Sequence, residues 1–546
     1  MKLKAFGKKL ACLGLAAAMT VSLSACGQKD TGGETGQAPA IQADSGEKIV
    51  NVGVTNSLGT LNPLQMDGGE INKYATGLMF LPLMELDADL NFEGMLADSI
   101  TAEDERNFLV HIDDRAAWSD GQPVTADDVI YTALKLASPT LANPAMMYYV
   151  FEGVGEDGFT EPGADHIDGI QKVDDKTVRF TTKEPMSLAT FRNSYARYLM
   201  TLPKHVIEKF SEEELATSDW FNHPDVVSGP FVVSDFDKDH YISYEVNENY
   251  WKEVPKIDKL NIKIVEGSQL LAGLKSGEID ITHPTMSVFP VEDYETVEAL
   301  EGVTAVYGDP VTNQSVFIQT SRVDDARVRQ ALLCAVNREQ ILDQLLKGHG
   351  EVVDGFLSSV SPYFDETITP VSYDPERAKS LLSEAGWDSS KSLKFYVNSG
   401  DSAFVNAAAI MAAQWQAVGI KVEIQTVDFA TLMSVATGGD YDILAVQYTY
   451  APVDPYADVS WLLGGEGSWT GYTHPEVEEA LGQVPLVNDT EQTKELYSVV
   501  DRRVQEDVPM FSAYIISPLA AKSDRLVNAE PTVYGFFNHV EQWDVR

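Results

Sequence analysis

The glycine spacing in this sequence that could bind phosphate is Gly153-Val-Gly155-Glu-Asp-Gly158. A Gly-x-Gly-x-x-Gly loop holds a pyrophosphate when it joins a strand to the N-terminus of a helix. Here Glu156 and Asp157 would place negative charge against the phosphates, and the next residues, FTEPGADH, are a poor start for a helix. We therefore interpret this segment as a loop and not as a nucleotide site.

Histidines and carboxylates show no catalytic or metal-binding spacing either. The nine histidines are scattered, and the sequence has no His-Glu-x-x-His, Cys-x-x-Cys, Gly-x-Ser-x-Gly or Gly-Lys-Ser/Thr pattern. The acidic run 87–94 resembles a calcium loop, but its glycine comes two positions too late and no glutamate closes it, so we interpret it as a solvated turn. We expect no enzyme activity, no metal site and no cofactor; a secreted hydrolase is the alternative from another class.

The N-terminus has the pattern of an export signal. Four lysines in the first nine residues precede an apolar run from Leu10 to Leu23, which is shorter than the roughly 20 residues that span a bilayer. The adjoining Leu23-Ser24-Ala25-Cys26 resembles the lipobox of bacterial lipoproteins, whose signal is cut before a cysteine that then carries lipid. The resemblance implies a signal peptide over 1–25 and a lipid anchor on Cys26; an ordinary secretory signal is the alternative.

The chain beyond the signal is strongly acidic. Residues 26–47 are rich in glycine and in polar and acidic residues, which is typical of a flexible stalk. The 546-residue chain has a net charge of −43, or −47 without residues 1–25, which carry four lysines and no acids. So acidic a surface argues against nucleic acid or an anionic lipid face as a partner. By length, the remainder makes two to four domains.

The cysteines of the exported body are too few to form a disulfide bond within it. The three cysteines are Cys12 in the signal, Cys26 and Cys334, so the exported body has one ordinary thiol and no internal disulfide. Cys334 lies in the apolar stretch ALLCAVN, which predicts a small core residue.

Strand-like and helix-like segments alternate along the body. Thr125, with Asp128 three residues later, is typical of a helix N-cap, and Asp374-Pro375 starts a helix that ends at Gly386. Apolar periodicity predicts one long amphipathic helix over 325–347. Further strands are predicted at 49–55 and 107–112.

A βαβαβ order is predicted near the C-terminal end of the body. It predicts an α/β domain with a largely parallel sheet. The predicted elements are strand 393–397, helix 403–418, strand 420–426, helix 429–437 and strand 441–446.

Several short sequence motifs, which occur in the expected order from about residue 50 to about 480, resemble motifs of the periplasmic-type solute-binding proteins of peptide ABC importers. This is the family of oligopeptide- and dipeptide-binding proteins. The most specific motif is Trp118-Ser119-Asp120-Gly121 with Pro123 to Val129. We interpret it as a turn and a helix start, and we expect Arg327 and Arg329 to pair with acids. The other motifs are Leu61-Asn62-Pro63 with 78–85, Leu96–Ser99, Gly229-Pro230-Phe231, Asn249-Tyr250-Trp251, Gly277–Asp280 and Asp325–Ala331.

The resemblance implies an α/β, two-lobed periplasmic-binding-protein fold with an additional third domain and a ligand cleft between lobes that hinge closed. The implied bounds are 48–85, 205–306 and 513–546 for lobe I, 86–204 for the additional domain, and 307–512 for lobe II. It also implies a monomer that delivers a peptide or other small solute to the permease subunits of an ABC importer. The receptor would be extracytoplasmic, held by lipid on the outer face of the cell membrane, or periplasmic. A signalling or adhesion lipoprotein would instead predict small repeated modules.

The ligand is the point at which this sequence departs from the family. In several members an aspartate after an aromatic residue, three residues before an Asp/Glu-Pro pair, holds the α-ammonium of the peptide. Here the pair is Asp454-Pro455, Tyr448 and Tyr450 supply the aromatic context, and Ala451 stands where the aspartate is expected. A peptide is the leading ligand; a glycoside, an opine-like conjugate and a metal complex are alternatives. The candidate contacts are Asn56, Ser57, Tyr448, Tyr450, Asp454 and Trp469.

Overall fold

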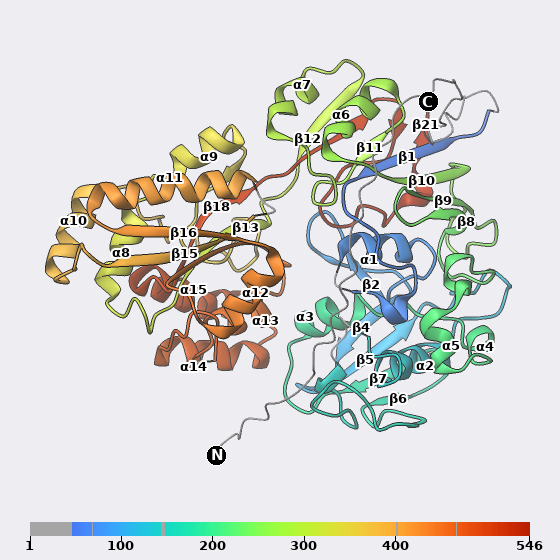
Figure 1. Ribbon diagram of the computed structural model, residues 1–546. Coiled ribbons are helices and arrows are strands. Elements are labelled where there is room, and N and C mark those ends of the chain that lie inside the picture. The colour runs from blue at the N-terminus through green and yellow to red at the C-terminus, as the bar shows by residue number, and fades with distance from the viewer. Residues whose placement is uncertain (1–45, 68, 144–147, 400–401, 466) are drawn as a thin grey trace, which may run out of the picture. The chain divides into compact units, whose positions relative to one another are not determined.

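The computed structural model describes residues 46–546 except 68, 144–147, 400–401 and 466 (Figure 1). The predicted signal peptide and Cys26 therefore lie outside the described residues, as does nearly all of the predicted stalk. Within the described part, no helix combines the length and the apolar character needed to cross a membrane.

A seven-stranded sheet forms what we call the first lobe. Its order is β12-β19-β11-β1-β10-β9-β8, with β1 parallel to β10 and β11 and the other pairings antiparallel. Val50, Val52 and Val54 alternate along β1 and are fully buried, as a half-buried strand requires. The strands are β1 Ile49–Val54, β8 Phe231–Asp237, β9 Tyr241–Val246, β10 Lys259–Ile264, β11 Ile281–Thr282, β12 Val303–Tyr307 and β19 Leu519–Ser523.

Short helices and strands complete the first lobe. Residues of α6 and α7 pack with β19 in one apolar cluster, while α1 packs with β1 and β10 in another. The helices are α1 Glu70–Gly77, α4 Lys204–Ile207, α5 Glu212–Thr217, α6 Gly267–Ser276 and α7 Tyr294–Glu298, and the remaining strands are β2 Met84–Leu86, β3 Phe92–Gly94, β20 Leu526–Val527 and β21 Asp544–Val545.

A four-stranded antiparallel sheet, which we call the added sheet, is inserted into the first lobe and shares its apolar core. The predicted cap at Thr125 is confirmed, because its backbone N–H and hydroxyl both donate to Asp128 at the start of α2. After the sheet, the short helix α3 runs into a π-helical turn at Arg192–Ala196. The elements are β4 Ala97–Ala102, β5 Asn107–Ile112, α2 Ala126–Leu136, β6 Ile170–Lys172, β7 Thr177–Thr181 and α3 Leu188–Phe191.

A six-stranded sheet, in the order β14-β18-β13-β17-β15-β16, forms the second lobe. The predicted βαβαβ order is confirmed, since β15 pairs in parallel with both β16 and β17. The prediction of a largely parallel sheet is wrong, because β13 and β18 enter antiparallel from distant parts of the sequence. The strands are β13 Thr312–Ile318, β14 Gly350–Glu351, β15 Ser392–Asn398, β16 Lys421–Val427, β17 Ile443–Thr449 and β18 Met510–Ile516.

Helices cover both faces of this sheet (Figure 1). Along β13, Val316 and Ile318 pack in one apolar cluster with α8 to α11, while Phe317 between them packs in another with α12 to α15. The helices are α8 Ala326–Cys334, α9 Arg338–Leu346, α10 Pro375–Glu384, α11 Ser402–Val418, α12 Phe429–Gly438, α13 Tyr456–Leu463, α14 Pro475–Gln483 and α15 Thr490–Asp507.

Two helices predicted from the sequence of this lobe can be compared with the observed N-terminal caps. The helix starting at Asp374-Pro375 is confirmed: the carboxylate of Asp374 accepts from the backbone of Arg377, and Gly386 has a φ of 66°. The single helix predicted over 325–347 is wrong. The first helix, α8, ends at Cys334. A second helix, α9, starts at Arg338, because the side chain of Asn337 accepts a hydrogen bond from the backbone N–H of Gln340 and caps it.

The chain crosses between the two lobes twice, from β12 to β13 and from β18 to β19. The crossings are joined by a hydrogen bond of 2.8 Å from the Gly308 N–H to the Pro518 carbonyl. A Cβ on Gly308 would lie 2.8 Å from the Pro284 Cβ and 2.9 Å from a Val533 methyl group. Two adjacent crossings of this kind are typical of a hinge.

We expect Gly308→Ala to lower the melting temperature and the free energy of unfolding by about 1–3 kcal/mol, because the methyl group overpacks the crossing. Gly482→Ala is the control: a Cβ there meets nothing within 4 Å in α14, so that variant should be as stable as the parent or up to about 1 kcal/mol more stable. Equal melting temperatures for the Gly308 variant and the parent would show that the crossing tolerates movement.

Candidate ligand site between the lobes

Asp454 lies in the loop between β17 and α13 and joins the second lobe to the added sheet region. Its Oδ1 accepts a hydrogen bond of 3.0 Å from the Thr190 hydroxyl, which lies 264 residues earlier in α3. The side chain is only 7 % exposed, and its Oδ2 has no hydrogen-bond partner among the described residues. A buried carboxylate oxygen without a partner is costly, so its presence needs a reason.

A second carboxylate, Asp458, lies four residues further on, in the first turn of α13. Its Oδ1 accepts a hydrogen bond of 2.5 Å from the Tyr448 hydroxyl. Burial raises the pKa of Asp458 to about 6, against the hydrogen bond from Tyr448. Burial also raises the pKa of Asp454 to about 6; hydrogen bonds from Thr190 and Asn193 lower it, and the charge of Asp458 raises it further.

Neither carboxylate is paired with a cation in the described structure. No described lysine, arginine or histidine forms an ion pair with Asp454 or Asp458. Of the other buried carboxylates, Glu85 and Asp354 each have a cationic partner, Arg197 and Arg338 respectively, whereas Asp501 forms no ion pair among the described residues. Buried charges are normally paired, so the Asp454–Asp458 pair is suited to receive a positive group from outside the chain.

The other predicted contacts in the second lobe have different surroundings. The Tyr448 ring is half-buried against Phe356. Tyr450 is buried, its hydroxyl accepts from the Ser358 N–H, and its carbonyl accepts from the Tyr534 hydroxyl of the first lobe at 3.2 Å. Trp469 is 4 % exposed in the core. The structure thus joins Tyr448 to Asp458, whose charge acts on Asp454, while Tyr450 and Trp469 are buried and stay predictions as ligand contacts.

The predicted contacts of the first lobe come at the end of β1. Asn56 is half-buried and Ser57 exposed, and they stand directly after a strand with parallel neighbours on both sides. Ligands in open α/β sheets lie outside the carboxyl ends of such strands. No hydrogen bond or ion pair of the described residues joins Asn56 or Ser57 to the second lobe, so both stay predictions.

Ala451 lies in an apolar cluster that spans the two lobes. This cluster contains Val453 and Val311 of the second lobe and Leu86 and Tyr534 of the first, with the partly buried Ala451 packed against it. An acid at position 451 would meet these apolar side chains. The nearby carboxylates are instead supplied three and seven residues later.

The remaining sequence motifs are structural. The backbone N–H of Trp118 donates to the Gln122 carbonyl, and Gly121 has a φ of 88°, as expected for the predicted turn. Arg327 pairs with Asp325, as predicted. The same prediction for Arg329 is wrong, because its guanidinium donates to three backbone carbonyls at 2.7–3.0 Å.

Cys334 is a buried core residue, as predicted, and burial raises the pKa of its thiol to about 11. The acidic run 87–94 forms a turn in which Asp87 Oδ1 accepts from the N–H groups of Asp89 and Asn91. Among the described residues, no group of three or more His, Cys, Asp or Glu side chains is arranged to hold a metal ion.

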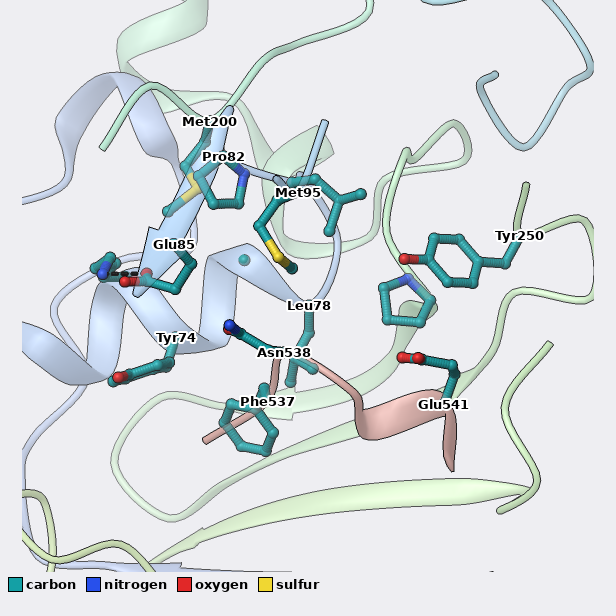
Figure 2. A pocket seen from close by; sticks show the side chains of 14 residues that line it. Tyr74, Leu78, Pro82, Glu85, Met95, Met200, Tyr250, Phe537, Asn538 and Glu541 are labelled. Atoms are coloured by element: carbon teal, nitrogen blue, oxygen red, sulfur yellow. Dashed lines mark ion pairs between the residues drawn. The ribbon is translucent and has the colours of Figure 1, made fainter. Parts of the chain in front are cut away.

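The first lobe also contains a small cavity. It lies between α1, β2 and the C-terminal segment, and is lined by Tyr74, Glu85, Tyr250, Asn538 and Glu541 among others (Figure 2). Its volume is about 40 Å³, which is room for one or two water molecules.

Three residues near the predicted contacts of the second lobe could not all be predicted from the sequence. Asp458 carries a weak signal, because it is an acid in the first turn of the helix that begins just after Asp454-Pro455. Trp461, three residues later, is 48 % exposed and lies on the same helix. Thr190 carries no signal, since only the tertiary fold brings it to Asp454.

The fold and this site define a class of protein. Two α/β lobes joined by two adjacent crossings, with buried polar groups between them, are typical of extracytoplasmic solute-binding proteins. The model of the family "Bacterial extracellular solute-binding proteins, family 5 Middle" matches residues 91–470. The chain therefore belongs to the bacterial extracellular solute-binding proteins of family 5, and its two-lobed α/β fold, expected from the sequence, is confirmed.

Named relatives match over most of the chain. The oligopeptide-binding protein AppA of Bacillus subtilis is 23 % identical over 551 residues, covering 96 % of each chain. A putative ABC transporter peptide-binding protein of Brucella ovis is 29 % identical over 416 residues, covering 74 % of this chain and 73 % of that protein.

Solved structures share the fold. The substrate-binding protein CtaP of Listeria monocytogenes has a TM-score of 0.77 at 22 % identity, covering 91 % of this chain and 99 % of that one. AppA of Bacillus subtilis, solved with a nonapeptide, has a TM-score of 0.71 at 22 % identity, covering 92 % of this chain and 99 % of that one. NikZ of Campylobacter jejuni, solved with Ni(L-His), has a TM-score of 0.70 at 20 % identity, covering 91 % of this chain and 99 % of that one.

We expect Asp454→Asn to stabilise the ligand-free protein at pH 7 and not at pH 4. The pKa of Asp454 in the folded state, about 6, lies above its ordinary value of 3.8, so the folded protein loses stability as the pH rises from about 4 through 6. Asparagine imitates the protonated acid and can still accept from Thr190. The gain at pH 7 should be about 1–3 kcal/mol.

Thermal unfolding at both pH values checks this prediction. Glu423→Gln, which removes an exposed acid from β16, is the control and should leave the melting temperature unchanged at either pH. A D454N protein that melts below the parent at pH 7 would show that the carboxylate is stabilised by a partner in the folded protein.

Proposed function

We propose that this protein is an extracytoplasmic receptor that binds an oligopeptide between its two lobes and hands it to the permease subunits of an ABC importer. The observation that carries the proposal is the pair of buried Asp454 and half-buried Asp458 at the junction of the lobes, neither of which has a cationic partner among the described residues. The free α-ammonium of a peptide supplies the missing positive charge. The two adjacent crossings supply a hinge on which the lobes close.

Relatives support the peptide. AppA of Bacillus subtilis is named an oligopeptide-binding protein and its solved structure holds a nonapeptide. In our proposal Asp454 takes the ammonium role that the aspartate at the position of Ala451 has in other members of the family. Asp454 lies three residues after Ala451. Its carboxylate is therefore outside the apolar cluster around Ala451 and close to Thr190 and Asn193.

The protein acts by binding and not by catalysis in this proposal. It is held as a monomer outside the cell membrane by a lipid on Cys26, after removal of residues 1–25. Residues 48–85, 205–306 and 513–546 make lobe I, residues 86–204 the additional domain and residues 307–512 lobe II. The seven-stranded sheet supports this division, since it draws strands from all three segments of the proposed lobe I; the second-lobe strand β18, however, runs to Ile516, four residues past the proposed bound at 512.

A metal complex is the second candidate ligand. NikZ, with the same fold, was solved with Ni(L-His), and a cationic complex would also meet the charge of two carboxylates. The alanine at position 451 favours this alternative, because the usual ammonium ligand is missing there. The two candidates differ in what Asp454 contacts: a peptide ammonium or the outer atoms of a metal complex.

Mass spectrometry of ligand co-purified with the exported chain, and then thermal-shift screening, tests the proposal. Di- to hexapeptides at 1,000 times their Kd should stabilise the fold by about 4 kcal/mol. N-acetylated forms of the same peptides should bind at least about tenfold more weakly, because acetylation removes the ammonium. Asp454→Asn should bring the free and acetylated peptides to similar affinity, while Glu423→Gln should not.

The outcomes separate the candidates. Stabilisation by Ni(L-His) with no peptide of any length raising the melting temperature would replace the peptide by a metal complex. A peptide that binds equally well before and after acetylation would remove Asp454 from the ligand site.

A further inference from the structure

A single α-ammonium on the ligand would compensate the charge of Asp454 and leave the second carboxylate, Asp458, without a cationic partner. One positive charge can neutralise one carboxylate, and Asp454, whose Oδ2 is the buried oxygen without a partner, is the acid placed for it. Asp458 has one hydrogen bond, from Tyr448, and no cationic partner among the described residues. A ligand with one charge would therefore leave a largely buried carboxylate uncompensated.

The charge of Asp458 acts on residues of the added sheet region as well as on its own lobe. Tyr198, just after the π-helical turn, has a raised pKa mainly because it is buried, and the charge of Asp458 adds to the rise. Asp458 likewise adds to the rise in the pKa of Asp454, which contacts Thr190 across the lobes. The two carboxylates thus lie close together on the same side of the second lobe.

An exposed aromatic surface lies beside Asp458. Trp461 is three residues further along α13, so the two side chains lie on the same face of the helix. The Trp461 ring is 48 % exposed and packs at 4.8 Å between centroids on the buried Trp469, which holds it in place. A tryptophan face beside a carboxylate suits a lysine or arginine side chain, whose stem packs on the ring while its charged end reaches the acid.

From these observations we propose that Asp458, Tyr448 and Trp461 form a second cation subsite beside Asp454, and that the preferred ligands are peptides whose first residue has a basic side chain. This inference rests on the proposed peptide-binding function and names its substrate class. The α-ammonium binds Asp454, and the side-chain cation of the same residue binds Asp458. Tyr448 orients the Asp458 carboxylate through its hydroxyl.

Two peptides of equal length isolate the second charge. Lysyl-trialanine and norleucyl-trialanine both carry a free α-ammonium and the same four-carbon side-chain stem, and differ in the ammonium at its end. Isothermal titration of the full exported chain at pH 7.5 should give at least about tenfold tighter binding of the lysyl peptide. Asp458→Asn should remove most of this preference while leaving norleucyl-trialanine bound as tightly as before or more tightly.

Two further variants keep the test sharp. Trp461→Ala should weaken both peptides, because both stems pack on the ring, whereas Glu423→Gln should change neither affinity. The melting temperature of each variant is measured alongside. Asp458→Asn removes an uncompensated carboxylate and should not unfold the protein at this pH.

The result that overturns the inference is distinct from one that overturns the proposed function. Equal affinity of the two peptides for the parent protein, or a lysine preference that persists in Asp458→Asn, rejects the second subsite and leaves peptide binding standing. Binding of neither peptide, with Ni(L-His) bound instead, rejects the proposed function and the inference with it.

Discussion

The proposed function depends on a buried carboxylate, Asp454, that has no cationic partner among the described residues. Asp454 is 7 % exposed, one of its oxygens has no partner among the described residues, and its pKa is raised to about 6 mainly by burial. The rest of the fold can supply such partners: Arg338 and Arg197 pair with other buried acids. Selection for stability alone would favour an asparagine at this position, so the carboxylate is best explained by a positive group that arrives with the ligand.

The two lobes bring this carboxylate to their junction. The second lobe presents Asp454 and Asp458 at the end of β17 and the start of α13, and the added sheet region presents Thr190 and Asn193 from the other side. The two crossings beside Gly308 are the only covalent links between the lobes in the described chain, and they lie together. In the proposed function, closure about this hinge is driven by the contacts that the ligand makes with both sides.

Local signals in the sequence predicted much of the fold. Caps at Thr125 and Asp374, and the alternation of strands and helices over 393–446, depend on neighbouring residues and were predicted correctly. The break at Asn337 was missed because the apolar pattern continues across it. The antiparallel strands β13 and β18 were not predicted because their pairing joins residues almost 200 positions apart. The same limit applies to the site: Asp454 was named from a motif, whereas its partner Thr190 comes from a distant helix.

The most direct test of the central claim is proton release on binding. Calorimetric titration of lysyl-trialanine near pH 6, in buffers of different ionisation enthalpy, counts the protons exchanged per ligand. If the ligand brings positive charge to Asp454 and Asp458, their pKa values fall on binding and about one proton in total leaves the protein. Binding without proton release at this pH would show that the ligand's charge does not reach the two carboxylates, and would contradict the account.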